Sequence, residues 1–461
     1  MSSTRFFCDV SLRDIRDQRA GGDLELDEVL AHVEHSARQA EGLRIWRAFD
    51  ASELAVRSAM PFVPSPYTAH PVTELWDMPF GAKDVFNSAR FGTEKGSSRW
   101  IGYRAGNDAR VIDHAARSGC VLVGMTATSE FAVDKESPTL NPHDPLRTPG
   151  TSSAGSAVAC ALGIVPFALG SQSGASIVRP ASYCGTIGMK PSFGLLPRTG
   201  ALKTSDSLDT VGFFAGRVDS LRPVLSALRV SGRDYPLVSE HVDPNRDVET
   251  DVATLRVGVV RTQQDDDCDL EVKTLFDSLL RAIAAAVADV REVDVRSALA
   301  GAHDVHDGIY NASLAYHLSE DFDANPDDFS PVLHDRMEAG RSVSRERYVR
   351  ALSEQERYAS VVGDALSTFD VAVSLATCTT APVRGERPVP DPSLMWTMVG
   401  VPAVCLPLGF TRQGLPVGVQ FIARKYRDYQ LLAGIEALAR AGVVHDRSLP
   451  VKGIEASSDD R

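Results

Sequence analysis

The feature that most constrains this chain is a run of small residues, 150–163, followed by a short apolar segment and a loop without large side chains. Residues 154–162 predict a closely packed helix of about 15 Å that starts at Ser152 or Ser153. Residues 164–169 predict a buried strand of about 20 Å. Because helix and strand run out and back over similar lengths, we expect Ser152 and Ser176 to lie close together.

The loop at 170–176 reads GSQSGAS and follows the predicted strand directly. Glycine and serine are common in turns, so the loop alone is compatible with an ordinary surface turn. The alternative is a ligand site, in which backbone N–H groups face a bound molecule closely and a serine lies at the centre. Both interpretations stay open on this segment alone.

A serine hydroxyl needs a base within hydrogen-bonding reach before it can attack an amide. The chain has no G-x-S-x-G motif, which excludes the α/β-hydrolase arrangement. His114, His143 and His317 sit in no distinctive pattern and are predicted to be surface or packing residues. Lys83, in the apolar segment GAKDVF, is the remaining candidate: it is either a structural lysine that extends to solvent or a buried one that loses its charge and acts as a base.

Composition and charge exclude several classes of function. The chain has 461 residues, 43% of them hydrophobic and 24% charged, which is typical of a soluble globular protein with a sizeable core. A net charge of −13 argues against a nucleic-acid groove or an anionic membrane surface as the partner. No apolar run reaches the ~18 residues of a membrane span and no signal peptide is evident, so we expect a cytoplasmic protein.

The seven cysteines form neither a disulfide framework nor a zinc signature, because no C-x-x-C pair occurs. Cys160, Cys184 and Cys405 lie in apolar segments and are predicted to be small core residues.

The order of predicted elements indicates an α/β sheet. Helices are expected within 10–60, a connecting loop at 61–75, and a frayed tail at 455–461. A helix at 109–118 precedes a strand at 120–125, and the region 217–370 then changes to a strand, a long helix and a polar helical stretch. Further strands are predicted at 255–260, 369–374, 400–407 and 414–422.

Several ordered motifs together resemble the amidase signature family of Ser–Ser–Lys hydrolases. They are GAKD at 81–84, GTSSAGS at 150–156, SGAS at 173–176 and CGTIGMKP at 184–191, supported by SEFA at 129–132, NPHDP at 141–145, SLDTVG at 207–212 and GLPVGVQ at 414–420. The resemblance is strong over 75–215 and weaker over 370–425, and the arrangement at 176–181 looks like the malonamidase-type branch and other bacterial amidases.

The resemblance implies a role for each member of a triad. Ser176 is the nucleophile, Lys83 the base, and Ser152 a bridging serine whose peptide bond with Thr151 is cis. The bare loop is then explained by an oxyanion hole made by backbone N–H groups, which large side chains would obstruct; its residues are Ser173, Gly174, Ala175 and Ser176. Ser153 and Ser171 either hold the bridging serine by hydrogen bonds or are ordinary loop and cap hydroxyls.

The chain departs from the family pattern without losing a catalytic group. Thr151, Ala154 and Ala175 replace glycines, so the loop is slightly fuller. Gln172 stands where the family often has an acidic residue. The arginine expected two residues after the nucleophile is displaced to three, as Arg179, which is either a structural tie for loop carbonyls or a clamp for a substrate carboxylate.

We therefore expect a single α/β domain over 1–461, with a mixed central sheet flanked by helices on both faces and a variable helical insertion at 220–365 that shapes the substrate mouth. The expected reaction is hydrolysis of a carboxylic amide or related C–N bond through a seryl acyl-enzyme. No metal or cofactor is required. The expected partner is a small amide, with neither nucleic acid nor membrane involved, and a homodimer remains open.

Two other functions remain open on the sequence. One is the glutaminase (A) subunit of a tRNA-dependent amidotransferase, which needs a second protein as its partner. The other is a catalytically silent binding protein with an amidase fold, against which the intact Lys83, Ser152 and Ser176 argue.

Overall fold

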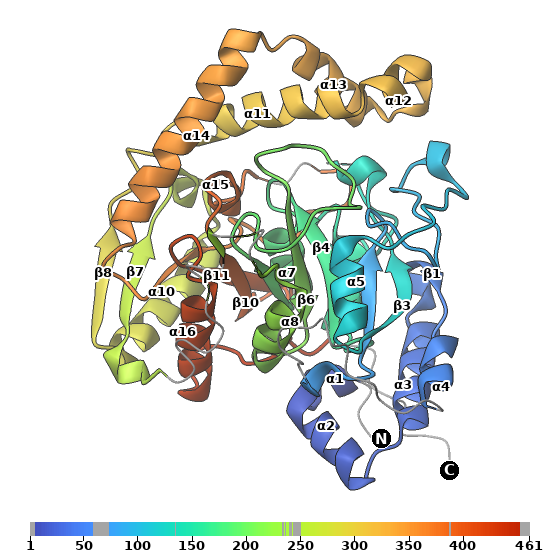
Figure 1. Cartoon of the computed structure of the whole chain (residues 1–461). Helices are drawn as coiled ribbons and strands as arrows, with labels where there is room; N and C mark the ends of the chain where they lie inside the picture. Colours follow the sequence, from blue (N-terminus) through green and yellow to red (C-terminus); the bar gives the residue numbers. More distant parts are fainter. Residues whose placement is uncertain are drawn as a thin grey trace.

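The computed structural model describes residues 5–58, 73–133, 135–232, 250–386 and 389–451, together with 235, 237, 238 and 242. The predicted tail at 455–461 and most of the predicted loop at 61–75 lie outside the described residues. Eleven strands of the described chain form one sheet in the order β1-β3-β2-β4-β6-β5-β10-β11-β9-β7-β8. Helices flank this sheet (Figure 1).

The strands are β1 (Trp46–Phe49), β2 (Pro79–Lys83), β3 (Val121–Thr126), β4 (Phe167–Gln172), β5 (Ile187–Lys190), β6 (Thr210–Ala215), β7 (Arg256–Val260), β8 (Asp289–Val293), β9 (Val371–Leu375), β10 (Ala403–Phe410) and β11 (Pro416–Ile422). The N-terminal helices are α1 (Phe6–Asp9), α2 (Leu12–Gly21), α3 (Leu26–Gln39) and α4 (Ser52–Ser58). The remaining helices are α5 (Arg110–Arg117), α6 (Ala154–Ala161), α7 (Val178–Cys184), α8 (Leu221–Leu228), α10 (Leu270–Ala286), α11 (Ala302–His317), α12 (Ser319–Ala324), α13 (Pro331–Arg341), α14 (Arg345–Ala365), α15 (Ser393–Met398) and α16 (Asp428–Arg440).

The sheet is mixed, as expected. β2 runs parallel to β3 and β4, and β7 runs parallel to β8 and β9, whereas β4, β6, β5, β10, β11 and β9 pair antiparallel in succession. The helix-then-strand alternation that predicts parallel pairing therefore holds in the two outer parts of the sheet and not in its centre. The strand β1, inside a region predicted to be helical, pairs antiparallel with β3.

β4 begins and ends three residues later than the prediction of 164–169. Its last residues, Gly170 to Gln172, pair with Gly212 to Thr210 of β6, although the composition of this stretch is typical of a loop. Gly170 suits this position because a Cβ there would lie 2.9 Å from the ring of Phe214. Backbone pairing thus extends the strand through the first part of the serine-rich segment.

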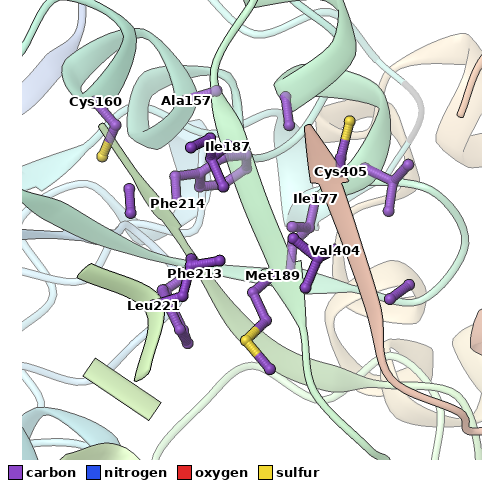
Figure 2. Close-up of a cluster of buried hydrophobic side chains, with 14 of the residues drawn as sticks. Ala157, Cys160, Ile177, Ile187, Met189, Phe213, Phe214, Leu221, Val404 and Cys405 are labelled. Atoms are coloured by element: carbon purple, nitrogen blue, oxygen red, sulfur yellow. The ribbon is translucent and has the colours of Figure 1, made fainter. Parts of the chain in front are cut away.

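α6 is the closely packed helix that the small residues predict. All eight of its residues are buried, and a Cβ on Gly155 would lie 2.6 Å from the Ile45 carbonyl oxygen and 2.8 Å from the Ala127 nitrogen. Figure 2 shows side chains of α6 within the buried cluster that also takes residues from β5, β6 and β10. The labelled members are Ala157, Cys160, Ile177, Ile187, Met189, Phe213, Phe214, Leu221, Val404 and Cys405.

The cysteines are core residues, as predicted. All seven are buried with free thiols, among them Cys160, Cys184 and Cys405. No helix in the described part of the chain is long and apolar enough to cross a membrane.

The region 220–365 contributes both helices and strands, and the strand predicted at 255–260 corresponds to β7. β7 and β8 come from this region and belong to the central sheet, because β7 pairs with β9. Helices α11, α12 and α13 lie along the top of the molecule in Figure 1, and α14 runs from there down toward the end of the sheet that contains β7 and β8.

Gly155 offers a test of the close packing of α6. In most helix interiors, Gly→Ala stabilises by up to about 1 kcal/mol. Gly155→Ala should instead destabilise by roughly 1–3 kcal/mol, because the added methyl group would contact backbone atoms that cannot move aside easily. The free energy of unfolding in urea measures this change.

The matched control is Gly363→Ala in α14, where nothing lies within 4 Å of an added Cβ. It should be neutral or stabilising. Equal effects of the two substitutions would contradict the packing described for α6.

Candidate active site

The site is built around Lys83, the last residue of β2. Its side chain is fully buried, and its Nζ lies 2.8 Å from Ser152 Oγ and 2.9 Å from Ser171 Oγ. Ser171 comes from β4, the parallel neighbour of β2, and Ser152 from the turn before α6. The structure thus brings Lys83, Ser152 and Ser171 together.

Burial changes the acidity of this lysine. It lowers the pKa of Lys83 from 10.5 to about 7, against the opposing effect of the Asp209 charge. A buried ammonium group loses its hydration, so the neutral amine is favoured near neutral pH. Lys83 therefore has the electrostatic properties of a general base at pH 7.

A second buried lysine shows that a lowered pKa alone does not make a lysine a base, because the groups that it contacts also matter. Burial also lowers the pKa of Lys190 to about 7. Its Nζ, however, donates to the carbonyl oxygens of Val401 and Pro191, which carry no proton that it could accept. Lys83 contacts hydroxyl groups instead, and only this arrangement permits proton transfer.

The turn that presents Ser152 differs from the expectation. No peptide bond of the described residues is cis, so the predicted cis bond between Thr151 and Ser152 is absent. Positive φ values at two consecutive residues, +107° at Gly150 and +81° at Thr151, turn the chain here with trans peptide bonds. A Cβ on Gly150 would lie 2.6 Å from Pro180 Cα, so this turn is in backbone contact with α7.

The hydroxyls around the bridging serine have defined partners. Ser153 occupies the N-cap position of α6, but its Oγ donates to the Ser171 carbonyl at 3.1 Å rather than capping the helix. Ser171 Oγ accepts from Lys83, and Thr128 Oγ1 donates to the Ser152 carbonyl at 2.8 Å. Ser153 and Ser171 therefore lie close to Lys83 and Ser152, but within the described residues neither hydroxyl bonds to Ser152 itself. Thr128 is a contact of Ser152 that the sequence did not single out.

The segment carrying Ser176 leaves several polar groups without partners. Ser176 is half-buried, and within the described residues its hydroxyl makes no hydrogen bond, so the structure does not join it to Ser152 directly. In the same part of the chain, the backbone N–H groups of Gly174, Ala175 and Ser176 donate to no acceptor. Three consecutive unpaired amides are suited to bind a developing oxyanion.

Gln172 fixes the two amides that follow this loop. Its Oε1 accepts from the Ile177 nitrogen at 2.6 Å and from the Val178 nitrogen at 3.0 Å. The residue that departs from the family's usual acid therefore still accepts two backbone hydrogen bonds.

The hydroxyl of Ser173 is held by a buried carboxylate. Its Oγ donates to Asp209 Oδ1 at 2.5 Å, and Asp209 also accepts from the backbone nitrogens of Thr204 and Ser205. A pocket that is partly open to solvent lies beside Ser171, Ser173 and Asp209. Lys83, Ser152 and Ser176 are not among its lining residues, so this pocket lies beside the site and does not contain it.

Arg179, the candidate carboxylate clamp, is already engaged. Its Nε forms an ion pair with Asp391, whose side chain is 1% exposed, while the arginine side chain is 15% exposed. Burial raises the pKa of Asp391 and the arginine charge opposes that rise. This pairing favours the structural interpretation of Arg179, and its role toward a substrate carboxylate stays a prediction.

The three histidines predicted to be surface or packing residues contact groups outside the site. His114 and His143 hydrogen-bond to the carbonyls of Leu228 and Cys184, and His317 lies 3.3 Å from Asp206. Besides Thr128, sequence reasoning missed His306 and Thr397, which contact carbonyls of the loop at 173–174. Neither belongs to a motif, so no signal in the sequence identifies them.

Comparisons with known proteins agree on one family. A family model described as Amidase matches residues 53–432. The A subunit of glutamyl-tRNA(Gln) amidotransferase from Acidothermus cellulolyticus is 32% identical over 416 residues, covering 79% of this chain and 82% of the relative. The protein of the same name from Treponema pallidum is 30% identical over 412 residues, covering 78% of this chain and 80% of the relative.

The solved structure of native peptide amidase from Stenotrophomonas maltophilia has the same fold. It superposes with a TM-score of 0.80 at 22% identity, covering 97% of this chain and 99% of that one.

The Arg179–Asp391 pair gives a stability prediction that separates its two interpretations. Arg179→Met leaves a buried carboxylate without its partner and should destabilise by about 3–5 kcal/mol in urea unfolding. The control is Arg412→Met: Arg412, 91% exposed, pairs with Glu271, and its loss should cost less than about 1 kcal/mol. A small effect at Arg179 would contradict the structural role and favour the substrate clamp.

Proposed function

The chain belongs to the amidase family, and we propose that it hydrolyses a carboxylic amide or a related C–N bond to an acid and ammonia or an amine. The single observation that carries the proposal is the contact of buried Lys83 with Ser152 at 2.8 Å. A lysine with a pKa of about 7 can accept a proton from a hydroxyl, which is the requirement for activating a serine.

In the proposed mechanism, neutral Lys83 accepts a proton through Ser152 as Ser176 Oγ attacks the substrate carbonyl. The carbonyl oxygen becomes an oxyanion facing the amides of Gly174, Ala175 and Ser176. Ser152 then passes a proton to the leaving nitrogen, the C–N bond breaks, and an acyl-enzyme remains on Ser176. Water, deprotonated by the same relay, releases the acid and restores the serine.

The test is a panel of short, aryl and carboxylated amides together with glutamine, scored by release of ammonia or amine. Ser176→Ala should lower turnover on the order of 10⁶-fold, since removing a nucleophile that acts as part of a unit abolishes covalent catalysis. Its unfolding curve should match that of the wild type. A purified variant that kept more than a few per cent of activity would exclude Ser176 as the nucleophile and the acyl-enzyme with it.

The acidity of Lys83 predicts the pH dependence of the reaction. Because only the neutral amine is a base, kcat/KM should rise about tenfold per pH unit below a pKa near 7 and level off above it. Lys83→Ala should lower kcat on the order of 10⁴-fold or more with a smaller change in KM. Lys83→Arg should be equally inactive because guanidinium remains charged.

Near-normal turnover of Lys83→Arg, or a rate that falls as the pH rises through 7, would contradict the relay.

A second candidate is favoured by the relatives, each of which is named as the A subunit of a glutamyl-tRNA(Gln) amidotransferase. In that case the protein would be the glutaminase component of a tRNA-dependent complex and would need a partner. Glutamine hydrolysis that depends on an added partner and tRNA would favour this candidate. Hydrolysis of simple amides by the protein alone favours the first. Absence of both activities, together with no labelling of Ser176 by a fluorophosphonate, would favour a catalytically silent protein.

A carboxylated substrate of the malonamate kind stays a prediction. It depends on Arg179, whose ion pair with Asp391 already offsets much of its charge.

A further inference from the structure

Two carbonyl groups of the loop that carries Ser176 are held from outside the loop. The first belongs to Ser173 and accepts a hydrogen bond from His306 Nε2 at 2.7 Å. Since a carbonyl can only accept, this nitrogen carries the proton. His306 is 4% exposed, and its ring lies 3.8–3.9 Å from where a Cβ on Gly174 would stand. The histidine therefore packs directly against the loop.

The second carbonyl belongs to Gly174 and accepts from Thr397 Oγ1 at 2.6 Å. The direction of this bond is fixed, because Gln172 Nε2 donates to the same hydroxyl at 2.8 Å. The Thr397 hydroxyl uses its lone pair for the glutamine, so its proton points at Gly174. Thr397 is fully buried, and no solvent competes for these contacts.

Because the peptide bonds are trans, these contacts also determine where the following N–H groups of the loop point. In a trans peptide the C=O and the following N–H point in opposite directions. Fixing the Ser173 carbonyl toward His306 aims the Gly174 N–H away from it. Fixing the Gly174 carbonyl toward Thr397 likewise aims the Ala175 N–H away. Both amides are among the three that have no acceptor in the described chain.

We propose that His306 and Thr397 are positioning residues that orient the amides of Gly174 and Ala175 toward the substrate's carbonyl oxygen. This inference rests on the proposed amide hydrolysis. His306 lies on α11 and Thr397 on α15. Helix α11, in the upper part of the molecule in Figure 1, thus contacts the loop that carries Ser176 through His306.

Paired variants test the proposal. His306→Leu and Thr397→Val remove each donor, whereas His306→Gln and Thr397→Ser keep a donor at a similar reach. The first measurement is the second-order rate at which a fluorophosphonate labels Ser176, because its phosphoryl oxygen occupies the oxyanion site while fluoride leaves. The second is the split between kcat and KM for an active amide of the panel.

The labelling rates of His306→Leu and Thr397→Val should fall about 10- to 100-fold. This loss is no larger than the effect of deleting one oxyanion donor. For the amide substrate, kcat should fall while KM stays within about threefold of the wild-type value, because the amides matter most once the oxyanion has formed. His306→Gln and Thr397→Ser should recover to within about fivefold of the wild type. The control is His317→Gln on the same helix, which should label at the wild-type rate.

The outcomes separate this inference from the proposed function. A wild-type protein that the probe does not label at Ser176 would overturn the proposed hydrolase. Labelling of the wild type, with His306→Leu or the nearly isosteric Thr397→Val labelled equally fast, would overturn the positioning role alone. Should His306→Leu fail to fold, the Thr397→Val and Thr397→Ser pair decides. If His306→Gln and Thr397→Ser lost as much kcat as His306→Leu and Thr397→Val, the contacts would be merely structural. This result would also overturn the positioning role.

Discussion

The desolvation of Lys83 is the constraint on which the rest of the site depends. An ammonium group at this depth would need strong acceptors or a counter-ion. Within the part of the chain that the structure describes, its hydrogen-bond partners are the hydroxyls of Ser152 and Ser171. Both can accept a hydrogen bond and both can donate, so they suit either protonation state. The same burial that makes the charged form unfavourable leaves a basic amine in contact with exchangeable protons.

Sheet register and side-chain size bring these groups together. In the parallel pairing of β2 with β4, Ala82 lies opposite Leu169, so Lys83 and Ser171 both fall at the carboxyl ends of adjacent strands. The turn containing Ser152 reaches the same level because α6 packs at backbone distance, with Gly155 against Ile45 and Ala127. Larger residues in α6 would move its first turn away from Lys83.

The features of the fold and of the site that could be predicted are those encoded in short segments of the sequence, whereas features that depend on long-range contacts could not. Lys83 and Ser152 lie within short motifs, whereas Ser171 lies in the serine-rich loop that follows the predicted strand. The out-and-back lengths of helix and strand predict that Ser152 lies near Ser176, and this proximity stays a prediction. The extension of β4 through Gly170–Gln172 was missed because strand pairing with β6 is a long-range property that composition does not carry. His306 was missed for the same reason: it contacts a carbonyl 133 residues away, and an isolated histidine has no local pattern. The expected cis bond came from the family resemblance and is replaced by positive φ at Gly150 and Thr151.

Gln172 shows how a departure from the family pattern can fit its surroundings. A carboxylate at this position could accept from the Ile177 and Val178 nitrogens, as the glutamine Oε1 does, but it could not donate to Thr397. The Thr397 proton would then have two competing acceptors, the carboxylate and the Gly174 carbonyl. The amide removes this competition because its NH₂ group donates to Thr397 at 2.8 Å. Gln172 and Thr397 therefore form one directional chain of hydrogen bonds that ends at the Gly174 carbonyl, and we expect a change at either residue to alter the orientation of the Gly174 peptide.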